Sequence, residues 1–377
     1  MDKKKYLNFT FKKGFVLIGV LQVCSLFSVI FAEEGKTENN KTVYQVLSNP
    51  KIINNENLKI SFLTDGLFSD AGWGAFGYNA AREVEKKYGY QIDFKENVKI
   101  KDIESTLKKY AKDGYDLIIS HGFEWGKPTL DVAKNFPQTN FIVFTGLVNA
   151  TNVASIFPMQ QEGSYLLGAL AAMMSKTGVI GFIGGEEYPN LINILEGYKL
   201  GALSINPDIR ILSTFLNEWD IPYKGKKGAL DQINRNADFI LQVADTSGHG
   251  VIEAGKEHKI FVFGSISDQH KLAPNTILTS LVLDVEKTFD QIIRNIQNQN
   301  FSGQIFKPGL EFYKGSSGDG IVYLAPFYSL ENNIPEKVKI KLDKLKNDII
   351  NGNLIVPERY EKEDHSNKII KKNNKNP

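Results

Sequence analysis

Apolar and polar positions follow a regular order along the chain from Leu58 onward. Short runs of apolar and β-branched residues, such as LKISFLT, alternate with segments whose apolar residues recur at helical spacing. This order predicts βα units with parallel strands. The first set of strands is expected at 58–64, 91–98, 115–120, 140–146 and 152–158, with helices up to about Tyr88, over 102–114 and over 128–135.

The pattern starts again at residue 160 with QQEGSYLLGALAAMMSKTG, a long apolar segment. Its length invites a membrane-spanning interpretation, but Glu162, Ser164 and Ser175 favour a helix buried between two lobes. Two sets of strands predict two α/β lobes, between which the chain crosses more than once, with a cleft that can close by hinge motion. The later elements are strands at 179–185, 209–215, 238–245, 260–267 and 275–283, a helix over 284–300, a strand over 320–327 and a closing helix over 335–353.

The first 32 residues differ from the rest of the chain. A basic start followed by the apolar run FVLIGVLQVCSLFSVIFA predicts an export signal over 1–32. An uncleaved anchor is the alternative, because this run of 18 residues is long enough to span a bilayer. Cys24 lies inside the run, so lipid attachment at Cys24 and simple cleavage near Ala32 are both open. In each case we expect the body to lie outside the cytoplasm, with membrane contact only through the signal or a lipid anchor.

Composition then divides the remainder of the chain. The polar, Asn-rich segment 33–57 is typical of a tether, and the polar C-terminal segment 358–377 is typical of a frayed tail. Between them we expect a first lobe of residues 58–157 plus 284–308 and a second lobe of residues 158–283 plus 309–357.

Charge and cysteine content exclude several classes of function. The 377 residues have 42% hydrophobic and 23% charged residues, which is typical of a folded, soluble body. The formal net charge of +2 becomes about −2 without residues 1–32, because that segment holds five of the 45 basic and one of the 43 acidic residues. Nothing in this balance calls for a nucleic-acid partner. Cys24 is the only cysteine, so the body has no disulfide and no cysteine-based metal site.

The candidate chemistry lies just after the strands, because ligands of parallel α/β sheets bind beyond the carboxyl ends of the strands. Trp73 and Trp219 fall in such loops, one in each expected lobe, and Phe123 follows the third strand. These aromatic residues suit the stacking of a flat heterocycle. The alternative is that each tryptophan only covers the core of its own lobe.

Polar residues in the same loops would bind the edge of such a ring. Asp70 is a candidate acceptor for a ring N–H, although an Asp at the start of a helix can instead cap backbone N–H groups. From the second lobe, Ser265, Asp245 and Asp268 are expected to fix the edge of the ligand, with helix capping again the alternative for the two aspartates.

Enzyme chemistry finds little support in the sequence. His121, His249 and His270 lie in strand-end loops and could in principle converge on a metal, but no H-E-x-x-H pattern or close pair accompanies them. The G-x-S-x-G and G-x-G-x-x-G patterns of hydrolases and dinucleotide-binding proteins are absent as well. We therefore expect no catalysis, no metal and no cofactor.

Several stretches together resemble the basic membrane protein family, substrate-binding proteins that include purine nucleoside receptors. They occur in the family's order over about residues 58–357 and include SDAGW, DGYDLIISHGF, FPQTNFIVFTG, EGYKLGALSINPDIRI, LQVADTSGHGVIEA and GSISDQ. The resemblance implies a type I periplasmic-binding-protein fold, with two Rossmann-like lobes, a ligand cleft and three hinge crossings. It also implies delivery of a purine base or nucleoside to the permease of an ABC transporter, with the ring held between Trp73 and Trp219 and with Asp70 at the family's acidic position.

The resemblance fails at three positions where the family commonly holds a ribose with charged side chains. Here those positions are Thr145, Ile266 and Leu283. Because a ribose diol gains most from charged hydrogen-bond partners, this departure favours a base over an intact nucleoside. Asp245 and Asp268 could compensate, so a nucleoside is not excluded. The alternatives are a surface-displayed lipoprotein or adhesin with an altered ligand, and a nucleoside-processing enzyme.

Overall fold

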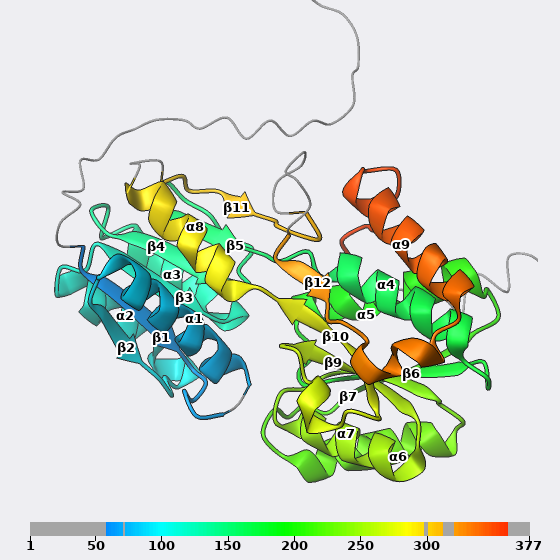
Figure 1. Ribbon diagram of the computed structural model, residues 1–377. Helices are drawn as coiled ribbons and strands as arrows, with labels where there is room; N and C mark the ends of the chain where they lie inside the picture. Colours follow the sequence, from blue (N-terminus) through cyan, green and yellow to red (C-terminus); the bar gives the residue numbers. More distant parts are fainter. Residues whose placement is uncertain (1–57, 71, 298–300, 312–319, 361–377) are drawn as a thin grey trace, which may run out of the picture. The chain divides into compact units, whose positions relative to one another are not determined.

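The computed structural model describes residues 58–70, 72–297, 301–311 and 320–360. Within these ranges the strands form two six-stranded sheets flanked by helices (Figure 1). The strands are β1 (Ile60–Thr64), β2 (Ile92–Lys95), β3 (Leu117–His121), β4 (Asn140–Phe144), β5 (Val153–Ile156), β6 (Val179–Gly184), β7 (Arg210–Phe215), β8 (Phe239–Val243), β9 (Phe261–Ile266), β10 (Ile277–Leu283), β11 (Ile305–Phe306) and β12 (Val322–Leu324). The α-helices are α1 (Trp73–Tyr88), α2 (Ile103–Lys112), α3 (Gly126–Ala133), α4 (Gln160–Met174), α5 (Pro189–Ile205), α6 (Pro222–Asn234), α7 (Ser247–His258), α8 (Val285–Gln297) and α9 (Glu336–Ile350).

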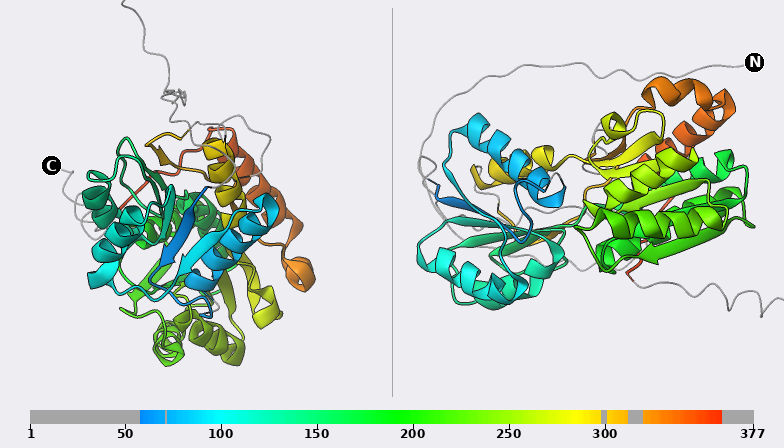
Figure 2. Two further views of the ribbon diagram at one scale, coloured as in Figure 1. Left: turned by 90° about the vertical axis from the view of Figure 1, so that its left-hand side faces the viewer. Right: turned by 90° about the horizontal axis from the view of Figure 1, so that it is seen from below.

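The first sheet has the strand order β11-β5-β4-β3-β1-β2, and all of its pairings are parallel. β1, β3 and β4 are buried along their whole length, because helices cover both faces of the sheet. α1 and α8 contribute to the core on one face, while α2 and α3 cover the other (Figure 2). This double coverage explains the continuous apolar runs in the sequence.

The second sheet has the order β12-β10-β9-β8-β6-β7, with β12 antiparallel to β10 and the remaining pairs parallel. α4 and α5 cover one face and α6 and α7 the other. α4 and α5 approach closely at Gly168 and Gly201, where a Cβ atom would lie 1.9 Å from a carbonyl oxygen of the partner helix. The small residues of α4 therefore serve helix packing, and much of its surface is buried.

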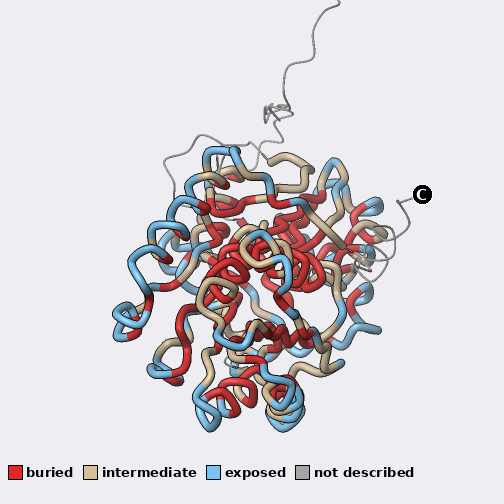
Figure 3. The backbone as a smooth tube through the Cα atoms, turned by 90° about the vertical axis from the view of Figure 1, so that its right-hand side faces the viewer, coloured by how far each residue is buried: buried red, intermediate tan, exposed pale blue. Residues whose placement is uncertain are grey.

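The chain connects the two sheets at three places in the described residues: between β5 and α4, between β10 and α8, and between β11 and β12. α8 follows a strand of the second sheet but packs on α1 of the first. The predicted restart and the repeated crossings are thus confirmed. Figure 3 colours the backbone by burial, with buried segments in red and exposed segments in pale blue.

Some elements differ from the sequence-based expectation. β11 was not predicted, because a strand of two residues is too short to show an alternation of apolar and polar positions. The membrane-spanning interpretation of residues 160–178 finds no support, since no helix of the described chain has the length and apolar character needed to cross a bilayer. α4 ends at Met174 and packs among other helices instead.

The predicted terminal segments are described only in small part. The expected signal over 1–32 with Cys24, and the expected tether over 33–57, lie outside the described residues. Of the expected tail, residues 358–360 are described and contact the body: Glu358 accepts hydrogen bonds from Lys307, and the Arg359 N–H donates to Asn193 Oδ1 at 2.8 Å. These three residues thus pack on the body, although the sequence placed them in the tail.

Candidate functional site

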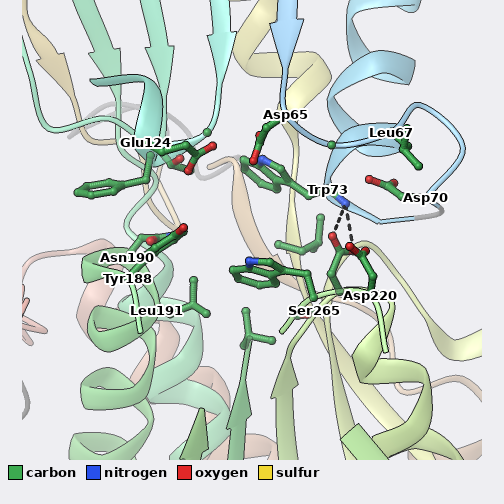
Figure 4. Close-up of a pocket in the computed structure, with 18 of the residues that line it drawn as sticks. Asp65, Leu67, Asp70, Trp73, Glu124, Tyr188, Asn190, Leu191, Asp220 and Ser265 are labelled. Atoms are coloured by element: carbon green, nitrogen blue, oxygen red, sulfur yellow. Dashed lines mark hydrogen bonds between the residues drawn. The ribbon is translucent and has the colours of Figure 1, made fainter. Parts of the chain in front are cut away.

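A cavity of about 510 Å³ lies where the carboxyl ends of strands from the two sheets meet (Figure 4). It is lined by segments that follow β1, β2, β3 and β4 of the first sheet and β6, β7 and β8 of the second, and by the last residues of β9. Its volume falls in the range of small-molecule sites. Six of the seven predicted binding residues line it: Asp70, Trp73, Phe123, Trp219, Asp245 and Ser265.

Asp268 is the predicted residue that the structure places outside the cavity lining. Its side chain is exposed, with Oδ2 accepting a hydrogen bond from the Tyr328 hydroxyl and Oδ1 accepting one from the His270 N–H at 3.0 Å. The backbone turns at Ile266, whose φ is +69°, so the residues after β9 leave the wall of the cavity. Asp268 is therefore engaged in a local turn and a contact with a distant tyrosine.

Trp73 is the first residue of α1, and its indole stacks on the imidazole of His121. The ring centroids are 4.0 Å apart and the planes differ by 14°. Burial lowers the pKa of His121 to about 3, so this imidazole is neutral, and its Nε2 lies 3.0 Å from the Trp73 carbonyl oxygen. His121 is thus a core residue that supports one face of the indole, while Trp73 still lines the cavity.

Asp70 binds the start of α1, as the capping alternative predicted. Its Oδ1 accepts the backbone N–H groups of Gly72 at 2.7 Å and Ala75 at 2.9 Å, and its Oδ2 accepts that of Gly74 at 2.8 Å. Three backbone donors at the helix start are satisfied in this way. The carboxylate of Asp70 lines the cavity, but much of its accepting capacity is used by the backbone.

Asp245 joins the loops of the two sheets. Its carboxylate oxygens lie 3.1 and 3.2 Å from the Trp73 backbone nitrogen, which donates to them (Figure 4). Next to it, the Thr246 hydroxyl donates to the Asp70 carbonyl oxygen at 3.2 Å. Burial, followed by the negative charge of Asp70, raises the pKa of the Asp245 carboxyl to about 7. Two neighbouring residues of the second sheet therefore bridge to the turn that holds Trp73.

Aromatic residues form a wall of the cavity that draws on both sheets. Phe123 packs against Tyr188 with ring centroids 6.1 Å apart, and Tyr188 packs against Trp219 at 6.2 Å. Sequence analysis did not select Tyr188, although it lies in the loop that follows β6. Its position in a loop at the carboxyl end of a strand was the signal that could have identified it.

The sequence analysis also missed several polar residues of the cavity, among them Asp65, Glu124 and Gln160. Burial, followed by the charge of Asp65, raises the pKa of Glu124 to about 8. Gln160 begins α4 and is only 4% exposed, and its Nε2 has no hydrogen-bond partner among the described residues. Asp65 and Glu124 could have been found from their positions at strand ends, whereas Gln160 gave no such signal.

Negative charge dominates the lining of the cavity. Its described residues include five carboxyl groups and a single ammonium group, that of the exposed Lys99. Thr145 and Ile266 occupy two of the positions where the resemblance implied charged ribose partners, and both line the cavity without charge. The third, Leu283, is 1% exposed in β10 and belongs to the core. In the part of the chain that the structure describes, no cluster of His, Cys, Asp or Glu could hold a metal ion.

Comparison with known proteins identifies the family to which the chain belongs. Residues 57–360 match the family described as ABC transporter substrate-binding proteins, PnrA-like. The chain belongs to this family. It is an ABC transporter substrate-binding protein, and since the family consists of solute-binding proteins, the enzyme alternative is set aside.

Two relatives support the same assignment, and one solved structure has the same fold. The chain is 31% identical to a purine-binding protein of Brucella abortus, over 79% of this chain and 83% of the relative. It is 27% identical to a nucleoside-binding protein of an ABC transporter in Lactococcus lactis, over 79% of this chain and 86% of the relative. A solute-binding protein of Aeropyrum pernix superposes with a TM-score of 0.72 at 23% identity, over 84% of this chain and 97% of the other. The fold is that of type I periplasmic solute-binding proteins.

Proposed function

We propose that this PnrA-like protein captures a purine base in the cavity between its two sheets and delivers it to the permease of an ABC transporter. The observation that carries the proposal is that Trp73 and Trp219, from loops of different sheets, line one cavity. The relatives named as purine-binding and nucleoside-binding proteins support a purine as the ligand. The export signal predicted over residues 1–32 supports an extracytoplasmic location.

The ring would stack on one face of the Trp73 indole, while His121 packs on the other face. Trp219 would contribute a second aromatic contact from the second sheet. Stacking contributes about 1 kcal/mol beyond the burial of area. Micromolar affinity requires about −8 kcal/mol, so apolar burial and hydrogen bonds at the ring edge must supply most of the binding free energy. Ser265 and other polar residues line the cavity and would provide such bonds.

A base fits the cavity better than an intact nucleoside. Thr145 and Ile266 line the cavity but lack the charge that would hold a ribose diol, and the Thr145 hydroxyl donates to the Phe144 carbonyl oxygen at 2.6 Å. The hydrogen bonds from Trp73 to Asp245 and from Thr246 to Asp70 would hold the cleft closed over the ligand.

Isothermal titration calorimetry of residues 33–377, refolded free of bound ligand, tests the proposal. We expect adenine, guanine or hypoxanthine to bind more tightly than the corresponding nucleoside. Nucleosides that bind at least as tightly would overturn the preference for a base. No heat of binding with any of the six compounds would refute the purine assignment and favour a displayed protein with another ligand.

A further inference from the structure

Residues 358–360, here called the strap, contact the chain where it leaves the first sheet. Lys307 directly follows β11, and its Nζ donates to the two carboxylate oxygens of Glu358 at 2.7 and 3.0 Å. Phe157 directly follows β5, and its ring packs edge-on against that of Tyr360, with the centroids 5.8 Å apart. The strap thus contacts two of the places at which the chain crosses between the sheets.

These two crossings are hydrogen-bonded to each other. The Phe157 N–H donates to the Phe306 carbonyl oxygen at 2.7 Å. Two residues further along, the Met159 N–H donates to the Pro308 carbonyl oxygen at 2.8 Å. Because the crossings are joined in this way, a contact that holds one of them also holds the other.

The strap also binds α5, which packs on the second sheet. The Arg359 N–H donates to Asn193 Oδ1 at 2.8 Å, and the Arg359 guanidinium lies 4.0 Å from the buried carboxylate of Glu196. Val356, two residues before the strap, is 4% exposed and packs in the hydrophobic core, which anchors the segment. The strap therefore joins strand ends of the first sheet to a helix of the second.

Asn193 connects the strap to the wall of the cavity. It is 1% exposed, and while its Oδ1 accepts from Arg359, its Nδ2 donates to Gln161 Oε1 at 2.7 Å. Ile194, the next residue of α5, lines the cavity, and so does Gln160, which precedes Gln161 at the start of α4. Two consecutive hydrogen bonds thus lead from the strap to the neighbours of lining residues, although none of the residues 358–360 lines the cavity.

We propose that the strap stabilises the bridged form of the cleft, in which Asp245 accepts the Trp73 N–H, and so raises ligand affinity from outside the cavity. Opening of a hinge would rotate α5 relative to the ends of β5 and β11. Hydrogen bonds weaken steeply when their distance and angle change, so this rotation would cost contacts of the strap. A segment that stabilises one of two conformations shifts the population toward it. The inference goes beyond the proposed function, and only the effect on purine affinity rests on that function.

Two shortened chains isolate the strap. Both begin at residue 33; one ends at Tyr360 and keeps the strap, and the other ends at Pro357 and lacks it. In titration calorimetry we expect the chain without the strap to bind purine bases about threefold to thirtyfold more weakly, as for the loss of a hydrogen bond, an ion pair and a ring contact. A chain without the strap that unfolds at a lower temperature but binds as tightly as its control would show a purely structural role and overturn the inference.

X-ray scattering of the ligand-free chains tests the strap without any purine. We expect the chain that ends at Pro357 to have a larger radius of gyration than the chain that ends at Tyr360, although it is the shorter of the two. If no purine bound to either chain, the proposed function would fail, and the radius alone would decide on the strap. Equal radii would then overturn the inference, as would equal radii together with equal affinities.

Point variants of residues 33–377 test the individual contacts. Glu358→Gln removes the charge that pairs with Lys307, and Tyr360→Ala removes the ring that packs on Phe157; each should weaken purine binding about twofold to fivefold. Combining Glu358→Gln with Lys307→Met should weaken binding no further than either change alone, because the same ion pair is lost in each case. Asp131→Asn, in an exposed ion pair of α3 outside the cavity lining, is the control that should change neither affinity nor radius. Strap variants that all bind as tightly as this control would overturn the inference, even if the chain without the strap failed to fold.

Discussion

Replacing Trp73 by alanine tests the stacking proposal, and the structure gives a magnitude for two separate effects. Truncating an aromatic anchor of a binding site costs about 2–4 kcal/mol, so the affinity for purines should fall about thirtyfold to a thousandfold. The same change removes the packing of the indole on His121 at 4.0 Å. A fully buried aromatic residue costs about 3–5 kcal/mol when truncated, and since Trp73 is only partly buried we expect a loss of about 2 kcal/mol in unfolding free energy.

Trp125→Phe is the matched control for Trp73→Ala. Trp125 is fully buried at the start of α3 and does not line the cavity. We expect Trp125→Phe to lower the unfolding temperature without changing the affinity, whereas Trp73→Ala lowers both. Titration calorimetry and thermal unfolding measure the two quantities on the same proteins. A folded Trp73→Ala variant that keeps its affinity within about threefold of the wild type would refute stacking on this residue.

Three further changes test the turn that holds Trp73. Asp70→Ala should cost about 1–2 kcal/mol of unfolding free energy, because three N–H groups at the start of α1 lose their acceptor; an unchanged chemical-denaturation midpoint would contradict this. Gly72→Ala would place a Cβ atom 1.4 Å from Oδ1 of Asp245, so we expect weaker binding and a larger radius of gyration by X-ray scattering, with little change in unfolding temperature. Because burial raises the pKa of Asp245 to about 7 in the bridged cleft, the bridged form holds that proton more tightly than an open form with Asp245 in water. Affinity should therefore fall as the pH rises from about 4 towards 7, by at most about tenfold per pH unit, and level off above 7, and Asp245→Asn should make this dependence shallower; calorimetry that shows affinity rising with pH would contradict the assignment.

The two-sheet architecture could be predicted because a strand buried on both faces of a sheet appears in the sequence as a short run of mostly apolar residues. Strands such as β1 and β4 are mostly apolar and buried throughout, and their loops begin with polar residues that are easily recognised. The same logic located Trp73, Trp219 and Asp245 at strand ends. β11 has only two residues, so no periodic pattern could reveal it.

The detailed chemistry of the cavity was harder to predict, because it depends on contacts between distant residues. Asp268 is held by Tyr328, 60 positions away, and nothing in the local sequence indicates that it points out of the cavity. Asp65 and Glu124 line the same cavity because β1 and β3 are adjacent strands. Gln160 belongs to an apolar segment, where a single amide gives no functional signal until the cavity is known.

The two glycines that flank Trp73 explain why a tryptophan occupies this turn. A side chain at position 72 would collide with Asp245, and a side chain at position 74 would place a Cβ atom 2.4 Å from the Leu67 carbonyl oxygen. With glycine at both positions, the backbone N–H of Trp73 is open to the carboxylate from the second sheet, while its indole lines the cavity. Under the proposed function, one residue thus stacks on the ligand through its side chain and receives the closing contact through its backbone. A ligand that orders the Trp73 turn would at the same time order the acceptor site of the second sheet, which makes ligand capture and cleft closure parts of one event.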